Sequence, residues 1–394
     1  MYTCKVSEGK WMKIFHTADW HLGKIVQSVH MTEDQRFVLK QFVEDVRKEQ
    51  PDVVIIAGDI YDRAVPPTEA VALLNGVLEE IVLSLEIPVF IIAGNHDSPG
   101  RLHFGSKMME RNGLHIVGKF EKDRKPAILQ DEYGEVHFHF VPFCDPSVVR
   151  VQFEDDDIRS HDDAMKKITT HIHEMKDPKA RHVFIGHAFV TPRGEARENT
   201  SDSEVALSVG GAEHVSHEYF QGFSYAAFGH LHREHQVGEN HIRYSGSLLK
   251  YSISEEHHEK GYLIVELTDD DVSVEKRKLI PRRDMRTVTA SLEEILAMER
   301  KEDYVFVELT DRAPILSPME KVRSIFPNAM HVMRKYIPEL TDEKKQVRKA
   351  RSQMNDLELF EAFYKEVTGQ NPEDEVIDLF KRAIDEQAKA ERDE

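Results

Sequence analysis

Five stretches of this sequence place metal-binding types of side chain directly after a short apolar run. These side chains are Asp19 and His21, Asp59, Asn95 and His96, His187, and His230 and His232. A mixed set of imidazole, carboxylate and amide donors suits Mn²⁺, Fe²⁺ or Zn²⁺. Two such ions about 3.5–4 Å apart activate a water and clamp a phosphate during phosphoryl transfer. The pattern therefore predicts a two-metal centre for phosphoester chemistry.

The spacing within these stretches favours shared ions. In the Asp-x-His and His-x-His pairs, both donors lie on the same side of an extended chain and can reach one ion. We expect Asp59 to bridge the two ions. Each residue also has an ordinary explanation, because a lone histidine at a strand end is usually satisfied by the backbone and an aspartate can stabilise a turn. Five strand ends with the same chemistry are much harder to attribute to packing.

His96 has a different expected role. Its neighbour Asn95 has the shorter reach that suits a metal ligand, which leaves His96 to hydrogen-bond the substrate and donate a proton to the departing oxygen. The alternative is a histidine that only orients Asn95. Lys24, Arg101 and Arg193 lie near the predicted site in the sequence and could contact phosphates, although solvated surface charge explains each of them equally well.

The elements that must position these residues are buried strands alternating with helices. Apolar runs that predict strands precede the five ligand stretches, at residues 12–15, 53–57, 87–93, 182–185 and 225–228. Helices are predicted at residues 32–48, 68–83 and 162–175. This alternation predicts a layered α/β (α+β) fold with partly parallel sheets. In such folds ligands bind beyond the carboxyl ends of strands, which is where each candidate residue lies.

The chain divides by composition into a main domain and two smaller parts. A boundary is predicted near residues 280–283, and residues 12–280 form the domain that carries the ligand stretches. Residues 284–336 have a β-α-β-α-β pattern and predict a small separate domain. Residues 1–11 have no recognisable pattern, so we expect a leader or an upstream start, with Met12 as the true first residue.

The last segment, residues 340–394, is strongly charged but contains two amphipathic stretches. The first places Leu357, Phe360, Tyr364 and Val367 on one helical face, and the second does the same with Ile377, Phe380 and Ile384. Short helices with exposed phenylalanines on a charged linker usually dock on a partner. We therefore expect a helical binding tail.

Charge and composition narrow the function classes. The chain has 394 residues, 52 basic and 71 acidic, with a formal net charge of −19. That balance argues against a protein that coats nucleic acid by charge alone, but bound cations invert the local field and leave a nucleic-acid enzyme possible. A membrane span and a secretory signal are not expected. Two cysteines cannot build a disulfide framework, which fits the reducing cytosol.

Taken in order, the Asp-x-His, Gly-Asp, Gly-Asn-His-Asp, Gly-His and Gly-His-x-His stretches resemble the calcineurin-like metallophosphoesterase superfamily. Residues 16–24 and 244–252 resemble its bacterial DNA-repair nuclease subunits, and the similarity covers residues 12–280. The resemblance implies a layered β-sandwich flanked by helices. It also implies one metal held by Asp19, His21, Asp59 and His232 and another held by Asp59, Asn95, His187 and His230, with His96 as the catalytic histidine.

The same resemblance implies a biological role. Members of this family prefer Mn²⁺, degrade duplex DNA from the 3′ end, and nick single strands and hairpins during repair and recombination. They act in the cytoplasm at the nucleoid, as a dimer with an SMC-like ATPase. Residues 284–336 would match their capping domain and the tail helices would bind the ATPase. Asp62 departs from archaeal and eukaryotic relatives, which have a second histidine there.

Two alternatives stay open. A phosphatase or small-molecule phosphodiesterase of the same superfamily would use the same metals but would not need the capping domain or the tail. A non-catalytic scaffold would keep the metal site for structure only. His96 at the acid position argues against the scaffold.

Overall fold

The computed structural model describes residues 11–192, 214–335, 356–368, 371–373 and 376–381. Residues 1–10 of the predicted leader, Arg193, and most of the tail linker lie outside this part of the chain. The chain divides into two compact units. Residues up to Leu309 together with Ile315–Met333 form the first, and Thr310–Pro314 together with residues from Arg334 onward form the second. The predicted domain boundaries at 12–280, 284–336 and 340–394 stay predictions.

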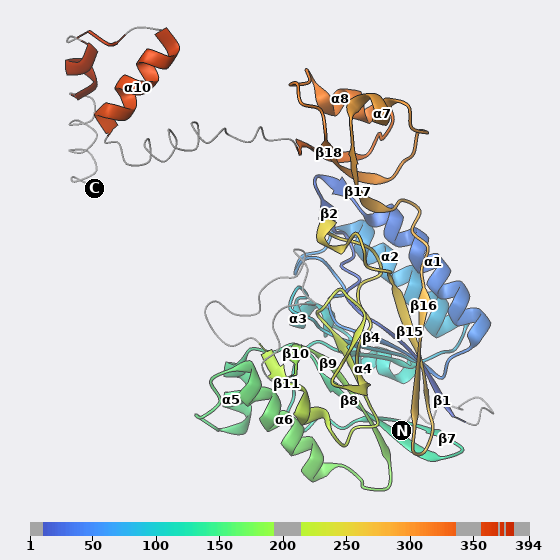
Figure 1. Cartoon of the computed structure of the whole chain (residues 1–394). Coiled ribbons are helices and arrows are strands. Elements are labelled where there is room, and N and C mark those ends of the chain that lie inside the picture. Colours follow the sequence, from blue (N-terminus) through green and yellow to red (C-terminus); the bar gives the residue numbers. More distant parts are fainter. Residues whose placement is uncertain (1–10, 193–213, 336–355, 369–370, 374–375, 382–394) are drawn as a thin grey trace. The chain divides into compact units, whose positions relative to one another are not determined.

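A six-stranded mixed sheet carries three of the five ligand stretches (Figure 1). Its strands in spatial order are β16 (Val272–Lys278), β15 (Gly261–Leu267), β1 (Met12–Thr17), β4 (Val53–Ala57), β5 (Val89–Ile92) and β6 (Leu114–Val117). β1, β4, β5 and β6 run parallel, whereas β15 pairs antiparallel with both β1 and β16. The parallel strands β4 and β5 are buried on both faces, which explains their uninterrupted apolar runs.

A second six-stranded sheet carries the other two ligand stretches. Its order is β13 (His235–Val237), β14 (Glu239–Tyr244), β12 (Tyr225–Gly229), β9 (Arg181–His187), β8 (Gly134–Val141) and β7 (Ala127–Asp131). β12 pairs parallel with β9, and their register places Gly229 opposite His187. The segments that end in His187 and in His230 therefore leave this sheet side by side.

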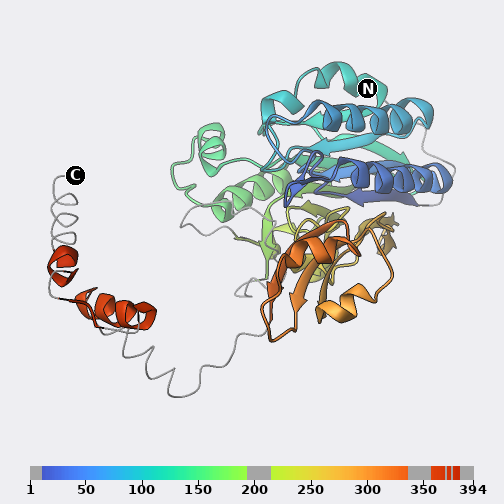
Figure 2. The same cartoon turned by 90° about the horizontal axis from the view of Figure 1, so that it is seen from above.

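The two sheets pack face to face, with helices outside each (Figure 2). Alternate residues along a strand point to different layers: Ile14 contributes to the core between the sheets, and Phe15 to the core beneath the helices. The core between the sheets contains Phe90 from the first sheet and Phe138 from the second. This arrangement confirms the predicted layered α/β fold and its β-sandwich.

The helices on the first sheet are α1 (Thr32–Glu49) and α2 (Thr68–Leu78), and α2 continues as a π-helical segment over Glu79–Ser84 that buries Ile81 and Val82. On the second sheet lie α5 (Pro146–Phe153) and α6 (His161–Met175). Ser160 begins α6 with a capping box. The shorter elements are α3 (Pro99–Leu102), α4 (Ser106–Met109), β2 (Ile25–Val26), β3 (Val29–His30), β10 (Phe189–Thr191), β11 (His214–Ser216), and short 3₁₀ turns at Glu110–Asn112, His217–Phe220 and Ile253–Glu255.

The segment after the boundary predicted near residues 280–283 has the β-α-β-α-β order that its sequence predicts. It consists of β17 (Met285–Ala290), α7 (Leu292–Leu296), β18 (Tyr304–Leu309), α8 (Pro318–Arg323) and β19 (Ala329–Arg334). We call these five elements the capping subdomain. Met285 and Tyr304 extend the core beneath α1 into this subdomain, so apolar packing joins the two.

The described part of the tail contains α10 (Asp356–Thr368) and a helical segment over residues 376–381. Phe360 and Phe380 stack with their ring centroids 3.9 Å apart, so the two predicted amphipathic stretches contact each other. Phe363 leaves 63% of its surface exposed. The side chains of Val367 and Ile384, expected on the apolar faces, lie outside the described residues.

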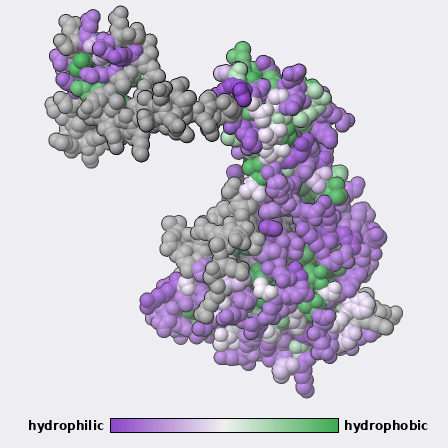
Figure 3. Space-filling view, in the orientation of Figure 1, coloured by the Kyte–Doolittle hydropathy of each residue, from purple (hydrophilic) through white to green (hydrophobic). Residues whose placement is uncertain are grey.

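The face of the molecule shown in Figure 3 is mostly hydrophilic, with hydrophobic side chains in small separate patches. Among the helices that the structure describes, none combines the length and the apolarity that a membrane crossing requires.

Candidate metal centre

The five ligand stretches meet where the carboxyl ends of β1, β4 and β5 face those of β9 and β12. Backbone hydrogen bonds tie the turns together within the first sheet, because the amide of Asp19 donates to the Gly58 carbonyl oxygen at 3.1 Å. Across the sandwich, the amide of His230 donates to Asp19 Oδ1 at 2.9 Å. The sequence-distant residues therefore converge through the edge geometry of two packed sheets.

The backbone at these strand ends is strained. Four of the predicted ligands have positive φ angles: 53° at Asp19, 44° at His21, 50° at Asp59 and 105° at His230. Such conformations cost about 1–3 kcal/mol each and gather at functional sites, where the surrounding structure enforces them. A glycine beside the ligands is also required, since a Cβ on Gly94 would overlap Asp59. These strained backbone conformations direct the donor side chains toward the centre.

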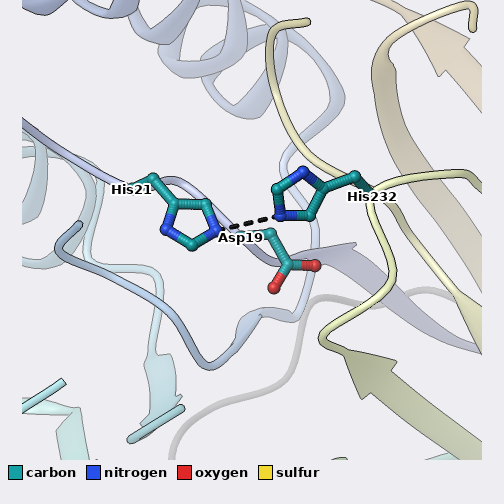
Figure 4. Close-up of side chains that lie close together, drawn as sticks. All are labelled: Asp19, His21 and His232. Atoms are coloured by element: carbon teal, nitrogen blue, oxygen red, sulfur yellow. Dashed lines mark hydrogen bonds between the residues drawn. The ribbon is translucent and has the colours of Figure 1, made fainter. Parts of the chain in front are cut away.

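Asp19, His21 and His232 form one donor group (Figure 4). One potential ligand atom of each lies within 4.8 Å of the other two, and all three side chains are buried. The two imidazoles face each other with their Nε2 atoms 3.0 Å apart. Two imidazole nitrogens can approach this closely when a proton lies between them, and their lone pairs can instead converge on one cation.

Asp59 lies at the middle of the centre. Its Oδ2 is 3.7 Å from His21 Nε2 on one side and 3.5 Å from His187 Nε2 on the other. Its Oδ1 accepts a hydrogen bond from the His96 amide at 2.9 Å, which fixes the carboxylate plane. One oxygen of Asp59 therefore borders histidines on both sides of the centre, and its bridging role stays a prediction.

Asn95, His187 and His230 form the second donor group. Asn95 Oδ1 lies 2.9 Å from His187 Nε2 and 3.3 Å from His230 Nδ1. His187 Nδ1 donates to the Ala57 carbonyl oxygen at 2.9 Å, which leaves Nε2 to point into the centre. The structure brings together all seven predicted metal ligands.

The electrostatics of the centre are those of a buried, highly charged site. Although burial opposes ionisation, the neighbouring histidines hold the pKa of Asp59 well below its usual range. Although burial favours the neutral imidazole, the Asp59 carboxylate raises the pKa of His187 to about 9. Burial raises the pKa of Asp19 to about 7. Ionised carboxylates buried to this degree cost much free energy unless cations neutralise them.

These donors fit divalent cations. Bonds of about 2.0–2.2 Å from a metal to nitrogen or oxygen place its ligand atoms within roughly 4.4 Å of one another. Two groups of predicted ligands, Asp19–His21–His232 and Asp19–Asp59–His187, meet a 4.8 Å limit without any rearrangement of the chain. His96 forms a third such group with His21 and Asp59. His21 Nδ1 is buried and makes no hydrogen bond to the described residues, whereas its Nε2 faces the other donors.

His96 borders the same centre from the more open side. Its Nδ1 donates to the Asp62 carbonyl oxygen at 2.9 Å, and its Nε2 lies 4.0 Å from Asp59 Oδ2. The side chain is 13% exposed, whereas His21 and His187 are fully buried. His96 is therefore placed where a group bound at the centre could meet an imidazole that is oriented but not enclosed.

The predicted phosphate contacts differ from each other. Lys24 Nζ forms an ion pair with Asp62 Oδ1 at 2.8 Å and lies beside the centre. Arg101 is exposed on α3, and Arg193 lies outside the described residues. Asp62, the position of the family departure, also has its Oδ1 3.8 Å from His21 Nδ1. The Asp62 carboxylate thus borders the centre from the Nδ1 side of His21.

Three buried residues outside the predicted ligand set support the ligands. Asp97 accepts hydrogen bonds from the amides of Gly94, Ile60 and Tyr61 at 2.9–3.1 Å and so joins two ligand turns. Gln35 donates to the His21 carbonyl oxygen at 2.7 Å. Glu255 Oε1 lies 3.1 Å from His232 Nδ1. Only Asp97, the last residue of the Gly-Asn-His-Asp stretch, carried a sequence signal; the other two sit in segments without a motif.

The fold and this site together define a metal-dependent phosphoester hydrolase. Residues 12–234 match the family model of the calcineurin-like phosphoesterases. Residues 281–368 match a model described as the type 5 capsule protein repressor C-terminal domain. The first match covers more than half of the chain, including all the predicted metal ligands.

Curated relatives extend over nearly the whole chain. A Staphylococcus saprophyticus protein, named as the SbcD component of the nuclease SbcCD, is 34% identical over 367 residues, which cover 91% of this chain and 94% of the relative. A protein of the same name from Staphylococcus epidermidis is 36% identical over 324 residues, covering 81% and 84%. The chain therefore belongs to the SbcD family of nuclease subunits, within the calcineurin-like phosphoesterases. Its role as a nuclease subunit and its use of divalent metal ions follow from that membership and from the donor groups.

Among solved structures, the GAP50 anchor of the Plasmodium inner membrane complex aligns with a TM-score of 0.40 at 11% identity, covering 84% of this chain and 98% of that one. A likeness of this degree says nothing about function.

Proposed function

We propose that this protein is the Mn²⁺-dependent DNA nuclease subunit of a complex with the SMC-like ATPase SbcC. It acts as a 3′-to-5′ exonuclease on duplex DNA and as an endonuclease on single strands and hairpins, in DNA repair and recombination. The proposal rests on one observation above all: Asp59 Oδ2 lies within 3.7 Å of histidines from both donor groups. A shared carboxylate of this kind is what a two-metal phosphodiesterase needs.

The assignment of the ligands follows the two donor groups. Asp19, His21, Asp59 and His232 hold one ion, and Asp59, Asn95, His187 and His230 hold the other. When bound, two such ions supply an activated water and neutralise the charge of the attacked phosphate. The chain's own contribution is to fix the donors: His187 through the Ala57 carbonyl and His232 through Glu255.

His96 is the general acid in this proposal. Because Nδ1 donates to the Asp62 carbonyl, Nε2 is the nitrogen that can carry a proton toward the leaving oxygen. The hydrogen bond to the Asp62 carbonyl oxygen fixes the orientation of the His96 ring, so Nε2 keeps one position relative to the centre. Lys24 and Arg101 are proposed to contact DNA phosphates; Lys24 lies beside the centre through its ion pair with Asp62.

The other parts of the chain serve the complex. We assign DNA selection to the capping subdomain and ATPase binding to the tail, where Phe363 and Leu379 remain 63% and 65% exposed beside the stacked Phe360–Phe380 pair. A homodimer within a heterotetramer is proposed as the assembly. Phe104 and Met108, 82% and 77% exposed around α4, offer apolar surface for self-association. The proposed location is the cytoplasm, at the nucleoid.

The experiment that tests the proposal is digestion of an end-labelled DNA duplex in the presence of Mn²⁺, with and without co-expressed ATPase. Release of nucleotides from the 3′ end, together with nicking of hairpins, is expected. Hydrolysis of bis-p-nitrophenyl phosphate without any action on DNA would indicate a small-molecule phosphodiesterase instead. A chain that lacks residues 340–394 should keep metal-dependent nicking and lose ATPase binding.

A further inference from the structure

Two pairs of consecutive residues connect the capping subdomain to the metal centre. One pair, Asp34 and Gln35, lies in the first turn of α1. The other, Glu255 and Glu256, lies at the end of the 3₁₀ turn at Ile253–Glu255. In each pair, one side chain contacts the capping subdomain or the linker that enters it, and its neighbour contacts a segment that carries a predicted metal ligand.

In the first pair, Asp34 is the residue that contacts the capping subdomain and its linker. Its carboxylate is 1% exposed and accepts hydrogen bonds from the Tyr304 hydroxyl at 2.7 Å and from Arg283 Nη1 at 3.1 Å. The fully buried Gln35 holds the ligand side. Its Nε2 donates to the His21 carbonyl oxygen at 2.7 Å, and its Oε1 accepts from the Gly23 amide at 3.1 Å.

In the second pair, Glu256 holds the capping side, because its Oε2 accepts a hydrogen bond from the Thr287 amide of β17 at 2.7 Å. Glu255 holds the ligand side through His232 Nδ1 at 3.1 Å. Lys260 completes this support by donating to the His232 carbonyl oxygen at 2.7 Å. Glu255 and Glu256 are adjacent in one turn and move together. A displacement of β17 that pulls on Glu256 therefore also shifts Glu255 and the His232 ring that Glu255 contacts.

Both pairs serve the same donor group. His21 and His232 belong to the group that includes Asp19. Among the described residues, the other group makes no hydrogen bond to the capping subdomain. His187 bonds the Ala57 carbonyl oxygen, and Asp97 holds the turn before Asn95 through the Gly94 amide. The His230 amide bonds Asp19 at the end of β1. The capping subdomain is thus linked to one half of the metal centre.

Packing at the junction makes these polar bridges more important. A cavity of about 430 Å³ lies between the capping subdomain and the sheets, lined among others by Met31, Leu249 and Tyr304. The pocket has room for water, so apolar contact between the subdomain and the sheets is interrupted there and is limited to the neighbouring core around Met285 and Tyr304. Hydrogen bonds at Asp34 and Glu256 then carry a larger share of the connection.

We propose that the capping subdomain sets the affinity of the metal subsite formed with His21 and His232, and that it affects the subsite formed with Asn95 and His187 far less, through the shared Asp59 alone. This inference rests on the two-metal centre proposed above. The groups that orient metal ligands typically change affinity by about 10–100-fold. A partner or DNA duplex that shifts the subdomain would therefore change the occupancy of one ion selectively, and with it the activity.

The test is Mn²⁺ titration of the full chain by isothermal calorimetry, with Tyr304→Phe and Glu256→Gln as the test variants. Tyr304→Phe removes one hydroxyl on the capping side and leaves α1 and every predicted ligand unchanged. We expect each variant to weaken one of two ions by about 10-fold and to leave the other within about twofold. His21→Gln and His187→Gln assign the two binding constants to their subsites.

Glu293→Gln is the matched control, because Glu293 is an exposed carboxylate on α7; both of its constants should equal those of the wild type. The double variant Asp34→Asn with Tyr304→Phe should weaken binding no more than the Asp34 change alone, since both act through one contact. Unchanged constants in Tyr304→Phe and Glu256→Gln, or equal weakening of both ions, would overturn the inference. A wild-type chain that binds fewer than two ions would instead overturn the two-metal centre itself.

Discussion

Asp59 Oδ2 lies 3.5 Å from His187 Nε2, and this single contact joins the carboxyl end of β4 in the first sheet to the end of β9 in the second. The contact raises the pKa of His187 to about 9 against the effect of burial. A charged pair at this depth marks the position where the two sheets contribute to one site. The predictions below begin with this carboxylate.

Replacing Asp59 with asparagine should abolish phosphodiester hydrolysis. Loss of a group that merely orients a ligand costs up to about 100-fold in metal affinity or activity, and a bridging ligand should cost more. The measurement is Mn²⁺ binding and turnover of bis-p-nitrophenyl phosphate. Asp123→Asn is the control, because that carboxylate is 82% exposed. Retention of two tightly bound ions in Asp59→Asn would contradict the bridging role.

Replacing His96 with glutamine should separate metal binding from catalysis. Loss of a general acid typically lowers the rate by about 10²–10⁴-fold, while the seven predicted ligands still hold the ions. We expect calorimetric Mn²⁺ affinity within about threefold of the wild type and a large drop in kcat. His30→Gln, an exposed histidine, serves as the control. If metal binding fell together with the rate, His96 would instead be a ligand or an orienting residue.

Metal removal should lower the thermal stability of the protein. A cation that binds only the folded chain stabilises it by about 2.7 kcal/mol at a concentration of 100 times its Kd. Addition of EDTA should therefore lower Tm by several degrees, and Mn²⁺ should restore it. The Asp59→Asn chain is the internal control, because its Tm should no longer respond to Mn²⁺. An identical Tm in EDTA and in Mn²⁺ would show that the donors do not hold metal.

His139, whose Nε2 lies 3.0 Å from His182 Nδ1 and away from the metal centre, should make the stability of the protein depend on pH. Burial, together with the charges of His182 and His137, lowers the pKa of His139 from 6.5 to about 3. Between these two values the unfolded chain binds a proton that the folded chain does not, so stability is lost as pH falls below about 6.5. His139→Gln should reduce the drop in unfolding free energy between pH 7.5 and pH 5, measured in urea. His257→Gln, whose side chain is 90% exposed, should leave that drop unchanged.

Charged substitutions around α4 should dissociate the proposed dimer. Phe104→Glu and Met108→Glu place carboxylates on side chains that are 82% and 77% exposed, so the fold of the monomer should tolerate them. Light scattering should then report a monomer in place of a dimer. Val151→Glu, 75% exposed on α5, is the control for charge on an apolar surface residue. An unchanged mass in the Phe104 and Met108 variants would place the dimer interface elsewhere.

The sequence by itself determined the fold class and predicted which side chains the structure brings together at the centre. Apolar runs that end in Gly-Asp or Gly-Asn-His-Asp predict both a buried strand and a side chain at its carboxyl end, because strand period and turn chemistry are local properties. The seven predicted ligands and His96 lie at one centre because the two packed sheets bring those strand ends together. The glycine at the end of β4 is part of the same sequence signal, because a Cβ at Gly58 would overlap the predicted ligand His187.

Only the tertiary structure decided which residues hold those donors in place. Gln35 and Glu255 reach His21 and His232 from 14 and 23 residues away in the chain, across packed elements with no motif of their own. A buried glutamine on a helix face looks like any other polar helical residue in sequence, because its function depends on what lies opposite it. The link from the capping subdomain through Asp34 and Glu256 is of the same kind. Local chemistry is encoded in neighbouring residues, whereas support across elements exists only once the sheets and the subdomain have packed.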